Sequence, residues 1–382
     1  MHDPRLSALA LLFVLPSLGG CSAPAPGAPL NAGGRTPPGS SDPAGARAAE
    51  PDSSAAATAP PANSSPSSGS GSETAAVPAD LRQGELPTQA PAPSGAQGSE
   101  AASAGPPGAG DCTSLPAASD YAAAGPFADA RMFSNVGPNS DYTLFRPDAS
   151  LGTNGFRHPI ATWGNGISTT PDQYQKTLSL IASHGFVIIA CNDTQAERPC
   201  LSAGLDWLVE QNGSAGELAG KLDTTREVTI GYSWGGGAAI DTADRPNVRA
   251  TVSLHGMPPR VATAFTAMHA PLLLFTSTGD SFVTARQYVT PNFESSQVPT
   301  FYATLADSNA GHLYVVDGGA AVCIGGILGL GSCQTAAAEQ APTIAWLRYW
   351  ACDDQDAKRF FFGPDCTLCS APWATPQRKQ LP

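Results

Sequence analysis

Short apolar segments alternate with helical patterns along the C-terminal part of this chain, and this alternation most narrows the folds that it can adopt. Near-continuous apolar runs, such as Val187–Cys191 and Val248–Leu254, are typical of strands that are buried on both faces. Strands separated by helices build a parallel sheet that helices cover on both sides. We therefore expect an α/β fold, with a doubly wound and mostly parallel sheet in a single domain.

The expected elements can be placed along the sequence. Strands are expected at 159–163, 187–191, 227–231, 248–254, 272–276 and 300–303. Helices are expected at 170–184, 205–211, 236–242 and 342–351. The first of these helices has the clearest start, because Thr170 and Gln173 form a capping-box pattern around Pro171. Ligands of such sheets bind at the carboxyl ends of the strands, so reactive residues are expected at that edge.

Residues 1–21 form a separate segment. Arg5 precedes a short apolar run, Leu6–Leu18, which is shorter than the roughly 20 residues that span a bilayer. This pattern predicts an export signal rather than a membrane helix. The segment ends in Leu18-Gly19-Gly20-Cys21, which resembles the lipobox of bacterial lipoproteins. That resemblance implies lipidation of Cys21 and anchoring in the bacterial cell envelope, at the outer membrane or cell surface, with plain secretion as the alternative.

Residues 22–111 are dominated by Ala, Pro, Gly and Ser and hold no aromatic residue and no Ile. Such a segment buries too little apolar surface to offset the entropy of ordering its backbone, so we expect a disordered linker. Residues 112–382 hold every Trp and Tyr and are expected to form one folded domain, as a monomer. The formal net charge of −12 argues against nucleic acid as a partner, because phosphate binding needs clustered Lys and Arg.

The nine cysteines of the chain are typical of an exported protein with disulfides. With Cys21 assigned to the lipid, an even number remains, as a disulfide framework requires. Local bridges across short loops are expected between Cys191 and Cys200 and between Cys323 and Cys333.

The other cysteines leave more than one pairing open. Cys352 is expected to pair with Cys366 or Cys369, and Cys112 with whichever of these two remains. Cys366 and Cys369 also have the spacing of a redox or zinc pair. The sequence has neither a second such pair nor a His nearby, so structural disulfides are the expectation.

Gly231-Tyr232-Ser233-Trp234-Gly235 is the strongest chemical signal in the sequence. It follows an expected strand and opens an expected helix, which is the strand–turn–helix context of a nucleophile elbow. A turn this sharp needs small neighbours, and the glycines of the segment supply them. The elbow presents the Ser233 hydroxyl at the sheet edge and directs the start of the next helix at developing negative charge.

A serine hydroxyl needs a base to accept its proton, and a histidine base needs an acid to hold its tautomer. His312 follows the last expected strand and is the best candidate for the base. Asp280 follows the strand at 272–276 and is the best candidate for the acid, which makes the chain order Ser, Asp, His. Asp307 is its main rival, because it lies close to His312 in sequence. His255 ends the strand at 248–254 and is expected to line the site without acting as the base.

An oxyanion hole needs two backbone N–H groups directed at one point. One is expected from Trp234, the residue after the nucleophile. The other is expected from the loop after the strand at 159–163, which reads Trp163-Gly164-Asn165-Gly166. Asn165 is the best candidate there, because the neighbouring glycines let the backbone approach a substrate closely. An ordinary strand-to-loop turn is the alternative interpretation of this segment.

Together these motifs resemble those of the secreted polyester hydrolases and cutinases, and of the related dienelactone-hydrolase-like and chlorophyllase-like esterases. The resemblance covers most of 120–382, including the loop up to Asn165, the stretch 182–187, the elbow and the Gly311-His312 pair. It implies an α/β-hydrolase fold and a serine esterase that cleaves apolar, insoluble or polymeric carboxylic esters through an acyl-enzyme.

Carried over by position, the resemblance makes Ser233 the nucleophile, Asp280 the acid and His312 the base. It likewise makes the amides of Asn165 and Trp234 the oxyanion donors. No cofactor is needed for this reaction, and no metal-binding spacing is present in the sequence.

Two positions depart from the family pattern. Polyester hydrolases usually carry an aromatic residue at the position of Asn165 and a Trp at the position of Leu254, and these groups sandwich an aromatic acyl unit. Their replacement argues against cleavage of aromatic polyesters. Substrate contacts are expected here from Trp163, Leu254 and His255.

Two other classes of function remain open from the sequence. A related enzyme could act on another acyl substrate, as a phospholipase or acetylhydrolase at the membrane surface where the linker holds it. A surface lipoprotein could also have kept the fold for binding alone, although an intact set of Ser233, Asp280 and His312 argues against this. Fold by itself does not decide among them.

Overall fold

The computed structural model describes residues 112, 115, 118, 120–317, 337–374 and 376–381. The predicted export signal, the linker at 22–111, the lipidation site Cys21 and the predicted Cys323–Cys333 bridge therefore lie outside the described residues. None of the helices in the described part is both long enough and apolar enough to cross a bilayer.

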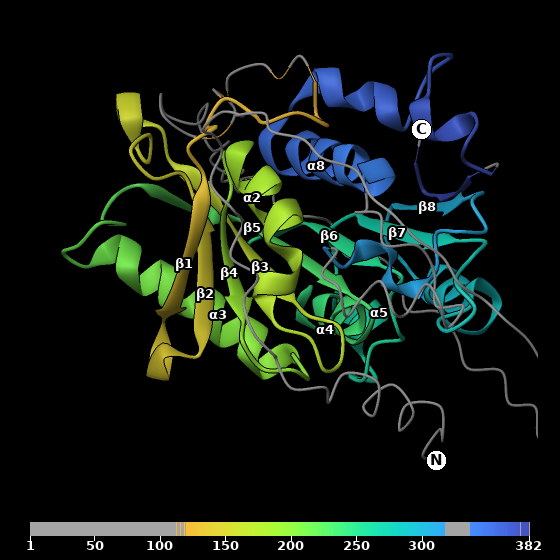
Figure 1. The fold of residues 1–382 in the computed structure, drawn as a ribbon, viewed down its shortest axis with the longest axis horizontal. Coiled ribbons are helices and arrows are strands. Elements are labelled where there is room, and N and C mark those ends of the chain that lie inside the picture. Colours follow the sequence, from red (N-terminus) through yellow and green to blue (C-terminus); the bar gives the residue numbers. More distant parts are fainter. Residues whose placement is uncertain are drawn as a thin grey trace, which may run out of the picture. The chain divides into compact units, whose positions relative to one another are not determined.

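A nine-stranded sheet forms the centre of the described domain, in the order β1-β2-β4-β3-β5-β6-β7-β8-β9 (Figure 1). Neighbouring strands from β4 through β3, β5, β6 and β7 to β8 are parallel, which confirms the mostly parallel sheet. β1 and β2 at one end of the sheet and β9 at the other pair antiparallel with their neighbours, and these three strands were not expected. The bounds are β1 Arg131–Val136, β2 Tyr142–Arg146, β3 His158–Gly164, β4 Val187–Cys191, β5 Leu222–Tyr232, β6 Val248–Leu254, β7 Leu272–Ser277, β8 Thr300–Leu305 and β9 Gln377–Lys379.

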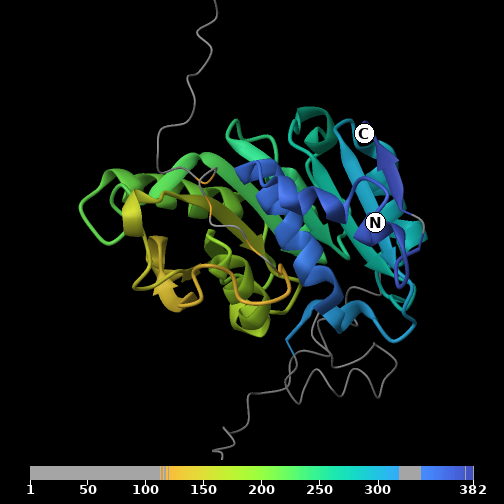
Figure 2. The same ribbon diagram turned by 90° about the horizontal axis from the view of Figure 1, so that it is seen from above.

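Helices cover both faces of the sheet (Figure 2). They are α2 Gln175–Ser183, α3 Arg198–Gly213, α4 Trp234–Thr242, α5 Ala264–Ala267, α6 Thr290–Ser295 and α8 Ala337–Cys352. Alternating side chains of β4 show the two layers. Ile188 belongs to the core cluster that includes Ile181 of α2 and Leu347 of α8. Ile189, next to it in the strand, belongs to the cluster that includes Leu205 of α3. The doubly wound arrangement follows from this alternation.

All four expected helices differ from the observed ones at their starts. The helix expected at 205–211 is part of α3, which begins at Arg198, and the one expected at 236–242 is α4, which begins at Trp234. The expected helix at 170–184 is a short 3₁₀ turn, Pro171–Tyr174, followed by α2, and its Thr170/Gln173 capping box is present. The expected helix at 342–351 is part of α8, which begins at Ala337 and carries Pro342 inside it. Treating Pro342 as a helix start was wrong, and the earlier start brings Glu339 into the first turn of α8.

The disulfides correct part of the sequence prediction. The Cys191–Cys200 bridge is confirmed. The expected pairing of Cys352 with Cys366 or Cys369 is wrong, because Cys352 pairs with Cys112 across 240 residues. Cys366 and Cys369 instead pair with each other across one 3₁₀ turn. The Cys112–Cys352 bridge ties the start of the domain to the end of α8. Sequence spacing does not reveal such a contact between distant segments.

Candidate active site

The predicted reactive residues come from neighbouring strands at one edge of the sheet. Ser233 directly follows β5, His255 directly follows β6, and Asp280 follows β7. His312 begins a 3₁₀ turn in the segment after β8. These four strands are parallel neighbours, so their carboxyl ends lie side by side, where open α/β sheets place their ligands.

The turn between β5 and α4 has the strained geometry of an elbow. Ser233 has φ 55° and ψ −117°, an uncommon conformation for a residue with a side chain. Close packing surrounds it, because a Cβ atom added to Gly235 would lie 2.0 Å from the carbonyl oxygen of Gly164. Only glycine fits at this position, and the result is a serine hydroxyl held at the start of α4.

A chain of hydrogen bonds links the three predicted reactive residues. The Ser233 hydroxyl donates to Nε2 of His312 over 2.9 Å, and Nδ1 of His312 donates to Oδ2 of Asp280 over 2.9 Å. A carboxylate only accepts, so the proton of a neutral His312 lies on Nδ1 and leaves Nε2 as the acceptor. All three side chains are buried, with 3%, 3% and 4% exposure for Ser233, His312 and Asp280.

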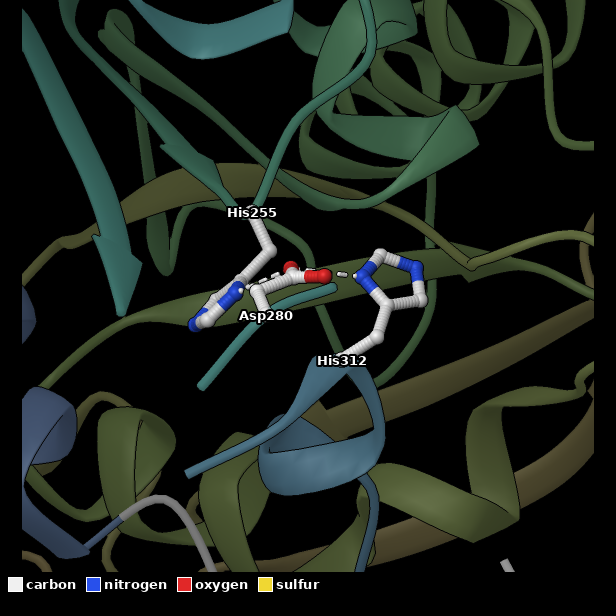
Figure 3. A group of neighbouring side chains, drawn as sticks. All are labelled: His255, Asp280 and His312. Atoms are coloured by element: carbon white, nitrogen blue, oxygen red, sulfur yellow. Dashed lines mark hydrogen bonds and ion pairs between the residues drawn. The ribbon is translucent and has the colours of Figure 1, made fainter. Parts of the chain in front are cut away.

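Asp280 is held as a carboxylate by four donors. Its Oδ1 accepts from the backbone N–H groups of Phe282 and Val283, over 3.0 and 2.7 Å. Its Oδ2 accepts from Nδ1 of His312 and also from Nδ1 of His255, over 2.9 and 2.8 Å (Figure 3). Burial alone would raise the pKa of Asp280, but the charges and hydrogen bonds of the two histidines outweigh it and hold that pKa well below its usual range.

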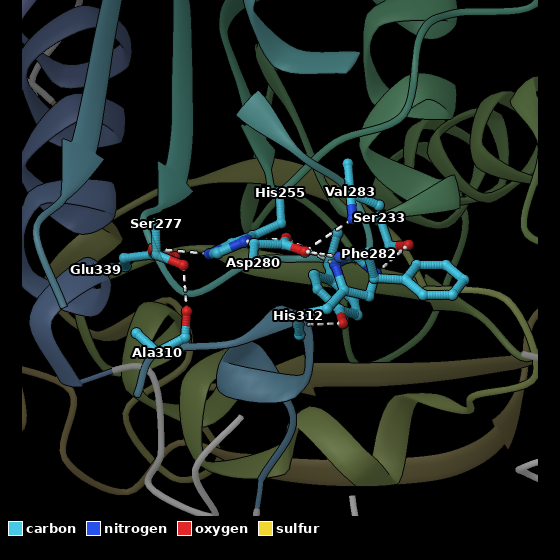
Figure 4. Close-up of polar contacts among 10 residues, drawn as sticks. Ser233, His255, Ser277, Asp280, Phe282, Val283, Ala310, His312 and Glu339 are labelled. Carbon is cyan, nitrogen blue, oxygen red and sulfur yellow. Dashed lines mark hydrogen bonds and ion pairs between the residues drawn. The ribbon is translucent and has the colours of Figure 1, made fainter. Parts of the chain in front are cut away.

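His255 makes a second contact with a carboxylate. Its Nε2 lies 3.0 Å from Oε1 of Glu339, in the first turn of α8 (Figure 4). Burial alone would lower the pKa of His255, but the charge of Glu339 and hydrogen bonds with Asp280 and Glu339 raise it to about 10. His255 therefore differs from the buried His158 and His184, whose pKa values burial lowers to about 4.

A small pocket opens onto Ser233. It encloses about 180 Å³ and is lined by Gly166, Ile167, Thr169, Tyr232, Ser233, His312 and Leu313. The Tyr232 hydroxyl donates to the carbonyl oxygen of His312 over 2.5 Å, which ties the base to the strand that carries the nucleophile. The Phe282 ring lies 5.4 Å from the His312 ring, centroid to centroid. The side chains that surround the Ser233–His312 pair are therefore mostly small or apolar.

The surroundings of the expected oxyanion hole are only partly as predicted. Trp234 is the first residue of α4, where backbone N–H groups have no partner within the helix. The Asn165 side chain is fully buried, and its Nδ2 donates to the carbonyl oxygen of Cys191. Ile167 lines the pocket, and its N–H makes no hydrogen bond within the described residues. The N–H of Gly166, between them, donates to the Tyr174 hydroxyl over 3.3 Å.

The expected substrate contacts of Trp163, Leu254 and His255 need correction. Their exposure is 0%, 2% and 0%, and none of them lines the pocket. Trp163 donates from Nε1 to the Asn165 side chain, and the Leu254 carbonyl accepts from the N–H of Ser233. These three side chains are buried next to the site and pack against its residues without lining the pocket. The rival acid Asp307 also lies apart, where its carboxylate accepts from the N–H of Asn309 in its own turn.

Sequence reasoning missed two residues that shape the site. Phe282 contributes both a ring beside His312 and an N–H to Asp280. Glu339 reaches His255 from a position 84 residues further along the chain. No local pattern marks either residue, although an acidic residue in a first helical turn is common because it interacts favourably with the helix dipole.

His255, Asp280 and His312 also bring enough ligand atoms together to be considered as a metal site, since these atoms lie within 4.8 Å of one another. In the structure, both Nδ1 atoms face Oδ2 of Asp280 at hydrogen-bond distance (Figure 3). A metal bound between them would have to replace both of these hydrogen bonds. The hydrogen-bonded arrangement fits proton transfer at Ser233 without further change.

Comparison with models of protein families gives a match over most of the described domain. The model of the PETase family, described as PET hydrolase-like, matches residues 118–375. This range includes all four strand-end residues of the candidate site and nearly the whole described domain. A comparison with curated proteins finds no match.

Proposed function

Because this chain belongs to the PETase, or PET hydrolase-like, family and is therefore a hydrolase of esters, we propose that it cleaves carboxylic esters through an acyl-enzyme on Ser233. The observation that carries this proposal is the continuous hydrogen-bond chain from Ser233 through His312 to Asp280 beside an open pocket. Proton transfer along this chain is the usual way to activate a serine hydroxyl.

Ser233, His312 and Asp280 each take one role in the proposed reaction. His312 accepts the hydroxyl proton at Nε2 as Ser233 attacks the ester carbonyl, and then delivers that proton to the leaving alcohol. Asp280 holds the tautomer and stabilises the imidazolium that forms. Water, deprotonated by His312 in the same way, then releases the acid from Ser233.

The tetrahedral oxyanion is stabilised by two backbone N–H groups. We propose Trp234 as one donor, at the positive end of α4. For the second, Asn165 stays the expectation from sequence, and its N–H has no partner among the described residues. Ile167 is a further candidate, because its N–H is also unpaired there and it lines the pocket. Losing one such donor costs about 100- to 1000-fold in turnover.

A direct experiment tests the role of Ser233. The full chain and its Ser233→Ala variant are compared on p-nitrophenyl esters from acetate to palmitate, with the exposed Ser295→Ala as the matched control. A fluorophosphonate should also label one peptide, the one that holds Ser233. Turnover by Ser233→Ala at the wild-type rate, or labelling elsewhere, would overturn the assignment.

The pocket supports a preference for short acyl groups. Seven of the described residues line it, and the space among them is about 180 Å³ even with open solvent included. We expect acetate and butyrate esters to turn over faster than palmitate. A maximum at long chains, or faster cleavage of phospholipid vesicles, would favour the phospholipase alternative.

The family description also raises polyesters as substrates. We propose that aliphatic polyesters are cleaved and aromatic ones poorly. Neither Asn165 nor Leu254 offers a ring, and the Trp234 ring is stacked under the Arg260 guanidinium at 4.3 Å. Release of acid from matched aliphatic and aromatic polyester films measures this directly. Anchoring of the enzyme by a lipid on Cys21 stays a prediction, tested by metabolic labelling with a fatty acid.

A further inference from the structure

The His255 ring bridges two buried carboxylates. Its Nδ1 lies 2.8 Å from Oδ2 of Asp280, and its Nε2 lies 3.0 Å from Oε1 of Glu339. Asp280 and Glu339 are 4% and 1% exposed, and His255 is fully buried. When both acids are ionised they only accept hydrogen bonds, so a ring that bonds to both donates from both nitrogens. A histidine with two N–H groups is an imidazolium.

The bridge extends the chain of contacts from Ser233 into the body of the domain. Glu339 belongs to α8, which packs on the sheet, and its Oε1 holds the far side of the His255 ring. The near side of the ring shares Oδ2 of Asp280 with His312. Asp280 therefore cannot rotate away from His312 without also breaking its bond to His255 (Figure 4).

The bridge also balances charge at the site. Among the described residues, the charged or titratable groups that face His255 are Asp280, Glu339, His312 and Tyr232, with the last two rings 6.2 and 6.5 Å away. Tyr232 is neutral, because burial raises its pKa well above the ordinary value. Asp280, Glu339 and an imidazolium at His255 sum to a single negative charge. His312 thus faces the same net charge as in a site with one lone carboxylate.

Resting on the proposed function, we propose that His255 and Glu339 are positioning residues of the ester hydrolysis. The His255 imidazolium holds Asp280 in line with His312, and Glu339 holds His255 in its charged form. Neither side chain reaches the pocket, so neither touches the substrate. The raised pKa of His255, in contrast to the lowered values of the other buried histidines His158 and His184, supports this assignment.

Removing the two charges one at a time and together tests the proposal. His255→Asn tolerates the φ of 47° at this position and leaves Asp280 and Glu339 as two uncompensated negative charges. The added negative charge favours the binding of a proton close to Ser233. The acidic limb of the pH profile of kcat/KM should move to higher pH by about one to two units, with kcat lowered more than KM is changed.

The double variant separates charge from packing. In His255→Asn with Glu339→Gln, one negative charge remains at Asp280, so the acidic limb should return towards the wild-type position. Glu339→Gln alone should leave the limb in place or move it to lower pH. His158→Asn is the matched control, since it alters another fully buried histidine that lies outside the site. His158→Asn should lower the free energy of unfolding and leave the acidic limb of the kcat/KM profile in its wild-type position.

A measurement that leaves His255, Asp280 and Glu339 in place covers the case in which their variants fail to fold. In Ser233→Ala labelled with ¹⁵N-histidine, long-range ¹H–¹⁵N spectra near neutral pH should show both His255 nitrogens protonated. A single protonated nitrogen would overturn the proposal, as would a limb that moves equally in the single and double variants. An active Ser233→Ala would instead reject the proposed function, so the two failures are distinguishable.

Discussion

Gly231 and Gly235 pack so closely that a Cβ atom on Gly231 would lie 2.1 Å from the carbonyl oxygen of Gly235. Real Cβ atoms do not approach backbone this closely, so Gly231→Ala must displace the turn that carries Ser233. We expect loss of nearly all esterase activity and a lower midpoint of urea unfolding. Gly213→Ala, where an added Cβ meets nothing within 4 Å, is the control and should be neutral or slightly stabilising.

Asp280→Asn should reduce kcat by about 10⁴-fold with little change in KM, the loss that a wrong histidine tautomer causes in a Ser-His-Asp triad. The amide would present an N–H where His312 and His255 now find an acceptor. Asp307→Asn is the matched control, because Asp307 is a loop acid that accepts only within its own turn, and it should retain wild-type kinetics. The reverse pattern would assign the acid to Asp307.

The two corrected disulfides should differ in their effect on stability. Replacing Cys112 and Cys352 by Ser opens a loop of 240 residues and should lower the free energy of unfolding by about 2–5 kcal/mol. The same change at Cys366 and Cys369 opens a separation of 3 residues and should cost less, because a short loop constrains the unfolded chain less. Urea unfolding of both double variants measures the difference, and equal losses would contradict the expectation.

Alkaline pH should weaken the domain through His255. Its pKa rises from the ordinary histidine value of 6.5 to about 10 on folding. Its stabilisation is therefore complete below about pH 6.5 and is lost as the pH rises towards about 10. Between about pH 7 and pH 9, the wild type should lose more unfolding free energy than His255→Asn does. Parallel curves for the two proteins would show that His255 is not charged in the folded state.

Chelation should leave the activity intact, although His255, Asp280 and His312 have the composition of a metal site. In the proposed reaction His312 transfers the proton while Asp280 and His255 hold its ring in position, and none of the three needs an ion. Hydrolysis of p-nitrophenyl acetate by the full chain is measured before and after dialysis against EDTA. Loss of activity that added Zn²⁺ restores would contradict the proposed role of the hydrogen-bond chain.

The sequence was most informative where structure is local. The apolar runs located all six parallel strands from β3 to β8, because strands buried on both faces need continuous apolar sequence. The antiparallel strands β1, β2 and β9 went unrecognised, since β1 and β9 at the sheet edges are partly exposed and carry no such run. Asp280 and His312 were selected by chain order, and the structure brings His312 into contact with Ser233 and Asp280 into contact with His312.

Contacts between distant segments were beyond sequence reasoning. Whether Trp163 and Leu254 face a substrate or support the site from beneath depends on which helices cover them, and the structure buries both. The pairing of Cys112 with Cys352 likewise depends on where α8 ends.

By itself, the sequence determined the elbow at Ser233, the parallel sheet and the family, because each rests on residue patterns within a few turns or strands. Only the tertiary structure decided that His255 lies between Asp280 and Glu339. A histidine becomes charged or neutral through the groups around it, and these come from three elements that only folding brings together.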